Sequence, residues 1–139
     1  MYERLVPDEA TIARSLEGPR DRARVAELMH ELVDRVSTYR TGYLALLELR
    51  LEAARRPGLR AVLTERIRAD VDANVRYHLE SGLPGDATAV ELLYLAMNWL
   101  ILERLALPGV FPEARLHELV EQAVERLVPD TKGGNGGPR

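Results

Sequence analysis

The sequence predicts an all-α fold, a single domain of about five to six helices. Apolar residues recur at helical spacing in one segment after another, whereas the period-two alternation typical of strands is almost absent. The length of 139 residues fits one domain, and 46% hydrophobic with 29% charged residues is the balance of a folded chain rather than a disordered one.

Residues that start and stop helices divide the chain into segments. Asp21 and Asp86 stand where N-caps are expected, because a carboxylate can accept hydrogen bonds from the first backbone N–H groups. Pro57-Gly58 and Pro108-Gly109 end the helices before them. We expect a leader with a short helix over 1–19, a helical domain over 20–129 and a disordered tail over 130–139. Within the domain, the expected helices are 20–37, 41–56, 58–81, 87–107 and 112–128.

The composition excludes several classes of protein. The absence of cysteine rules out disulfide scaffolds, thiol nucleophiles and cysteine-ligated metal sites. A formal net charge of −3 has the wrong sign for a chain that binds nucleic acid through a broad surface, because the phosphates are negatively charged. The N-terminus has no apolar signal segment, and the longest uncharged apolar run, Leu92 to Leu102, is too short to cross a bilayer. We therefore expect a cytoplasmic protein that does not enter membranes.

The sequence offers no catalytic machinery, so we do not expect an enzyme. The only glycine-dense stretch is the tail, and no strand precedes it, so a phosphate-binding loop is not indicated. His30, His78 and His117 are far apart in sequence, and none has a second histidine one turn away. We expect no metal site and no cofactor. His30 and Asp34 are one turn apart, which favours a surface ion pair.

The helix expected over 87–107 is apolar on all sides. Such a helix must be covered all round, either at the centre of a monomer or by a second subunit. We favour a homodimer, in which this helix and 112–128 pair with their copies in a four-helix interface. The pattern leaves open which face of 87–107 meets the partner. The residues expected in the interface are Leu92, Leu93, Leu100, Leu116, Leu119, Val120 and Val124.

Polar residues interrupt the apolar faces of three helices. An unpaired polar group facing a core costs about 1–3 kcal/mol, so each of these must meet another polar group, water or a ligand. One interpretation is a closed network, for example Arg66 with Asp70 and Arg50 with Glu103. The other is a cavity for a small molecule, mostly apolar with a few convergent polar groups. The candidate ligand-binding residues are Arg50, Arg66, Asp70, Asn74, Tyr77, Tyr94, Asn98 and Trp99.

The run from Thr41 to Leu63, above all Leu-Glu-Ala-Ala-Arg-Arg-Pro-Gly-Leu-Arg at 51–60, resembles the C-terminal domain of tetracycline-repressor (TetR) family regulators. The resemblance continues in order and spacing through the last two long helices. It implies an all-helical domain that binds a small-molecule effector between its middle helices and dimerises through its last two. The family has no fixed ligand motif, so the candidate residues still rest on periodicity.

Members of that family begin with a helix-turn-helix that binds DNA, and we do not find it in this chain. Thr11 to Gly18 is the nearest match, but its glycine comes one residue late and Pro19 follows. DNA would therefore be contacted only through an N-terminal domain missing here. The leading hypothesis is an effector-binding and dimerisation domain that senses a small, largely apolar molecule. The alternative is a stand-alone helical interaction module without a ligand.

Overall fold

The computed structural model describes residues 20–129, and within them the regular structure is helical. The all-α prediction is confirmed. The chain forms α2 (Arg22–Ser37), α3 (Arg40–Ala53), α4 (Pro57–Glu80), α5 (Ala87–Ala106) and α6 (Glu113–Leu127). The expected leader and tail lie outside the described residues. None of the described helices combines the length and the apolar character needed to cross a membrane.

The capping residues predicted from the sequence form the expected hydrogen bonds at the starts of α2 and α5. The Asp21 carboxylate accepts a hydrogen bond from the backbone N–H of Arg24, 3.0 Å away, at the start of α2. Asp86 does the same for Ala89 at 2.9 Å at the start of α5. Pro57 occupies the first turn of α4, where its missing N–H costs nothing. These helix starts follow from local chemistry, which is why the sequence predicts them closely, whereas α3, expected to continue to 56, ends at Ala53.

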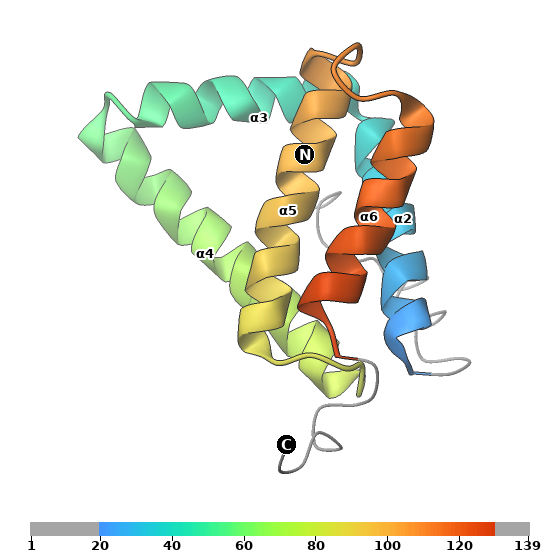
Figure 1. Cartoon of the computed structure of the whole chain (residues 1–139). Coiled ribbons are helices and arrows are strands. Elements are labelled where there is room, and N and C mark those ends of the chain that lie inside the picture. The colour runs from blue at the N-terminus through green and yellow to red at the C-terminus, as the bar shows by residue number, and fades with distance from the viewer. Residues whose placement is uncertain (1–19, 130–139) are drawn as a thin grey trace.

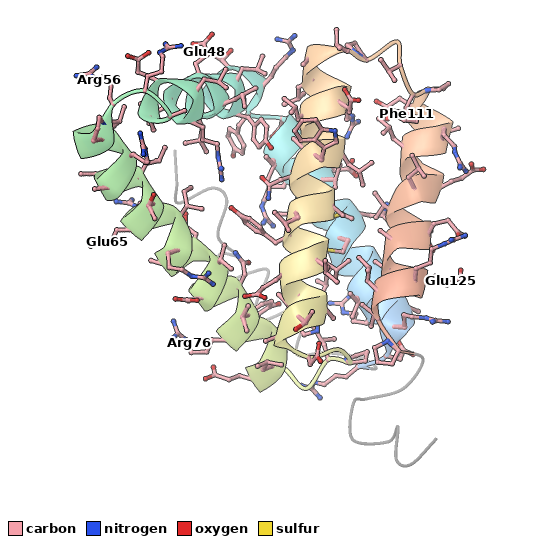
Figure 2. All side chains as sticks on the ribbon, turned by 60° about the vertical axis from the view of Figure 1, so that its left-hand side comes forward. Glu48, Arg56, Glu65, Arg76, Phe111 and Glu125 are labelled. Carbon is pink, nitrogen blue, oxygen red and sulfur yellow. The ribbon has the colours of Figure 1, made fainter. Side chains whose placement is uncertain are left out.

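The helices form two groups that share α5 (Figure 1). In the first, α2, α5 and α6 run side by side as a three-helix bundle, each packed against the other two. In the second, α3, α4 and α5 form the sides of a triangle, with α3 and α4 meeting at the Pro57-Gly58 corner. Figure 2 shows Glu48, Arg56, Glu65 and Arg76 pointing outward from the two outer sides of this triangle.

The main hydrophobic core belongs to the bundle. Buried residues recur at helical spacing on each of its helices: Val25, Leu28 and Val36 on α2, Leu93, Met97, Ile101 and Leu105 on α5, and Val120 and Val124 on α6. A separate, smaller cluster of Leu46, Ala53 and Leu63 fills the corner between α3 and α4. The space between these two cores is where a cavity can form.

Candidate functional site

A cavity of about 130 Å³ lies between the bundle and the triangle. Its walls are α2, α3, α4 and α5, and Leu83 from the α4–α5 loop also lines it. Most of the wall is apolar, including Leu28 and Met29 on α2 and Leu93 and Met97 on α5. An apolar cavity with a few convergent polar groups is the usual make-up of a small-molecule site.

The structure brings most of the candidate ligand-binding residues to this cavity. Arg50 from α3, Asp70, Asn74 and Tyr77 from α4, and Tyr94 and Asn98 from α5 all line it. Arg66 and Trp99 lie outside the cavity wall. Arg66 is exposed on α4, and Trp99 is 64% exposed on the outer side of α5. Trp99 follows Asn98, and one residue turns a helix by about 100°, which carries its side chain away from the cavity.

Tyr43 of α3 also lines the cavity, although it is not among the candidate residues named from the sequence. Its hydroxyl is 2.9 Å from the backbone oxygen of Asn98 and 3.1 Å from Oδ1 of the same residue, so it can donate to either. Burial raises the pKa of Tyr43 to about 12, against a smaller opposing effect of Arg50. The Asn98 amide in turn donates to the backbone oxygen of Tyr94 at 2.8 Å. These bonds tie α3 to α5 across the top of the triangle.

Arg50 and Tyr94 form the second polar contact across the cavity. A guanidinium nitrogen of Arg50 lies 3.5 Å from the Tyr94 hydroxyl, which is a long and weak hydrogen bond. The pKa of the Tyr94 hydroxyl is raised, mainly by burial, while Arg50 opposes the shift. The expected pairing of Arg50 with Glu103 is not formed among the described residues, because Arg50 reaches α5 at Tyr94 instead.

Asp70 is the one candidate whose side chain remains unsatisfied. Its Oδ2 atom is buried and has no hydrogen-bond partner among the described residues. The Asn74 amide, one turn away, donates to the backbone oxygen of Asp70 at 2.9 Å and not to the carboxylate. Burial raises the pKa of Asp70, and the charge of Arg66 lowers it by less. A closed network, one of the two interpretations of the sequence, is therefore incomplete at this carboxylate.

The residues expected in a dimer interface divide into two groups. Leu93, Leu116, Val120 and Val124 are buried within the chain itself, and all of them but Leu116 belong to the bundle core. Their apolar character therefore needs no partner subunit. Leu92 is exposed, and Leu100 and Leu119 are half-buried. Leu95 and Trp99, which the interface prediction leaves out, extend the exposed apolar face of α5.

Residues 20–130 match the family described as Tetracyclin repressor-like, C-terminal domain. The chain belongs to this family. The match covers all five described helices and confirms the resemblance seen at residues 51–60. C-terminal domains of Tetracyclin repressor-like proteins are regulatory rather than enzymatic. The comparison with curated proteins gives no match.

Proposed function

We propose that this chain is the effector-binding and dimerisation domain of a Tetracyclin repressor-like regulator, and that its cavity holds a small, largely apolar molecule. One observation supports this above the others: an apolar cavity between the two helix groups, with a buried carboxylate oxygen that the protein leaves unpaired. In a complete regulator, DNA would be contacted by a helix-turn-helix outside residues 20–129.

The cavity indicates the size and chemistry of the effector. Apolar cavities of about 150 Å³ bind benzene, so about 130 Å³ holds a single ring without rearrangement. A larger molecule would have to displace a wall. The unpaired Oδ2 of Asp70 requires a hydrogen-bond donor, and a cationic donor would also compensate its charge. We therefore propose an effector with an apolar body and one amine or hydroxyl group placed toward α4.

Four single-ring probes test the cavity directly: toluene, benzyl alcohol, benzylamine and benzoate. Binding would be measured by calorimetry and by the rise in Tm of the full chain. Benzylamine should bind roughly tenfold more tightly than toluene, because a hydrogen bond to a charged group contributes about 1.5–3 kcal/mol. Benzoate should bind least, because its charge repels Asp70. Asp70→Asn should remove the preference for the amine and leave toluene binding unchanged.

A cavity-filling variant with a matched control separates the cavity from the surface. Leu47 lines the cavity, and Leu51 lies one turn later on α3 and is 59% exposed. Leu47→Phe should block all four probes, while Leu51→Phe should bind them like the wild type. If the wild type binds no probe, or if Leu51→Phe loses binding equally, the effector proposal is wrong, and the chain acts as a helical interaction module.

We further propose that the outer face of α5, with α6 beside it, pairs with a second copy. Leu92, Leu95 and Trp99 lie at helical spacing and are 43%, 62% and 64% exposed. A contiguous apolar face of this kind is typical of an interface. Light scattering at micromolar concentration should give twice the chain mass of 15.6 kDa. Trp99→Glu should give the monomer, because dimerisation would bury its charge.

Val62→Glu is the matched control for the interface. Val62 lies on α4 and is 69% exposed, so the same type of substitution is placed on a surface outside the proposed interface. This variant should remain a dimer. A monomeric wild type, or equal dissociation of the Val62→Glu variant, would contradict the proposed pairing face.

A further inference from the structure

Two histidines and a glutamate meet where α2 packs against α6, outside the effector cavity. His117 and Glu121 are one turn apart on α6, and His30 faces them from α2. The Nε2 atom of His30 lies 2.7 Å from Oε2 of Glu121. The rings of His30 and His117 are stacked, with centroids 3.9 Å apart and planes inclined by 17°. The expected pair of His30 with Asp34 is not formed, because Asp34 instead pairs with Arg104.

The three side chains offer a ligand set that suits a transition metal. One ligand atom from each lies within 4.8 Å of the other two. In a tetrahedral zinc site with bonds of about 2.0–2.2 Å, ligand atoms are about 3.3 Å apart. The His30–Glu121 pair, at 2.7 Å, would therefore have to open by about 0.6 Å, and any wider pair would have to close by about 1.5 Å at most. Two imidazoles and a carboxylate favour zinc-type metals, whereas magnesium and calcium prefer oxygen ligands.

The backbone on both sides of the cluster is held in place. Val120 and Val124 of α6 are buried in the bundle core beside the cluster. At one end, Arg104 of α5 pairs with Asp34 of α2 at 3.2 Å and with Glu113 of α6 at 3.0 Å. At the other end, Arg22 donates to the backbone oxygens of Glu125 and Val128. Ligands carried on fixed helices lose little freedom when a metal binds.

We propose that His30, His117 and Glu121 form a site for a divalent transition metal of the zinc type, which joins α2 to α6. His30 is half-buried and Glu121 is 52% exposed, so the fourth coordination position faces solvent and would be taken by water. Sequence spacing could not reveal the site. His117 and Glu121 are one turn apart on α6, but the third metal ligand, His30, comes from α2, which is distant in the sequence.

Zinc titration of the full chain without a polyhistidine tag tests the site. Calorimetry should show one Zn²⁺ per chain, and Mg²⁺ should not bind. His117→Ala and Glu121→Gln should each weaken zinc binding about 100-fold or more, since loss of even an outer-shell partner costs 10- to 100-fold. Zinc should raise the Tm of the wild type, because the metal binds the folded state, and should leave the Tm of His117→Ala unchanged.

Glu118→Gln is the matched control. Glu118 is a neighbouring carboxylate on α6 that pairs with Arg115 at 3.1 Å and is not part of the cluster. This variant should bind zinc as the wild type does. Circular dichroism of each variant without metal should match the wild type, which excludes unfolding as the cause of lost binding. The proposal is overturned if the wild type has no stoichiometric zinc site, or if Glu118→Gln weakens binding as much as Glu121→Gln.

Discussion

The bundle of α2, α5 and α6 and the triangle of α3, α4 and α5 differ in how they are held together. The bundle has a continuous apolar core, with Met97 and Val124 almost fully buried. The triangle has a small apolar cluster at its corner, and polar side chains and a cavity where it meets the bundle. The stable part of the domain and the part suited to accept a ligand are therefore separate groups of helices that share α5.

This division has a thermodynamic meaning. Regions with few buried apolar contacts open at lower free energy than packed cores, and ligand-binding segments are drawn from such regions. The triangle fits that description, since α3 and α4 expose large apolar residues such as Leu51 and Val62. We therefore expect substitutions in the bundle to reduce global stability and substitutions in the triangle to act mainly on the site.

Replacing a leucine by alanine in each of the two regions should give the largest difference in the free energy of unfolding. Leu105 is buried in the bundle core, and its replacement by alanine should lower the free energy of unfolding by about 3 kcal/mol. Leu47 is half-buried and already borders a cavity, so Leu47→Ala should cost about 1 kcal/mol. Chemical denaturation of both variants measures the difference. Equal losses would show that the two regions are equally well packed.

The next largest loss of stability is expected at the corner between α3 and α4. Arg60 donates to the backbone oxygens of Ala53 and Ala54 at 3.2 and 3.1 Å, which satisfies carbonyls at the end of α3. Arg60→Ala should therefore lower stability by about 1 kcal/mol. Arg55→Ala is the control, because Arg55 makes only an exposed ion pair with Glu52. Hydrogen exchange should show the loss at α3 and α4; faster exchange in α6 would contradict a local role.

His78 should make stability depend on pH. It is buried at the end of α4, where its Nε2 donates to the Pro84 oxygen at 2.7 Å. Burial lowers the pKa of His78, and the hydrogen bond opposes the shift by less. Below pH 6.5 the unfolded chain gains a proton that the folded chain resists, so stability falls as the pH falls. Tm measured from pH 7 to 5 should fall less steeply in His78→Gln; an unchanged slope would exclude His78 as the cause.

The smallest expected effect is a gain in stability. Burial raises the pKa of Asp70, so the folded state resists its ionisation, and the ionised group destabilises the fold at neutral pH. Asp70→Asn should raise Tm slightly at pH 7, and the difference should disappear toward pH 4 as the aspartate is protonated. The same variant should lose the preference for benzylamine. A lower Tm at pH 7 would mean that Asp70 stabilises the fold through its charge.

Helix positions could be predicted from the sequence because their signals are local. Asp21, Asp86 and the Pro57-Gly58 pair act within one turn of themselves, and the structure places the helix ends accordingly. The faces of α5 could not be predicted in this way. The residues of α5 itself are apolar on all sides of the helix. Periodicity therefore cannot predict that Met97 is buried and Trp99 is exposed. Only the packing of α2, α3, α4 and α6 around α5 decides which residues are buried.

The same distinction applies to the sites. Asp70 and Asn74 are recognisable because polar residues interrupt an otherwise apolar arc of α4. Tyr43 carries no such signal, since an amphipathic tyrosine is ordinary on an apolar stripe. The cluster of His30 with His117 depends on contact between helices far apart in the chain, which no local pattern encodes.

Among the described helices, α2 alone borders both proposed sites. Val25, Leu28 and Met29 line the cavity, and His30, the next residue along, faces α6. A molecule that moved α2 would alter the separation of the metal ligands, and a metal that fixed α2 would alter the cavity wall. Thermodynamic linkage then makes the coupling reciprocal. If the effector changes the affinity for the metal by some factor, the metal must change the affinity for the effector by the same factor. Titrating each in the presence of the other would measure that coupling as a single number.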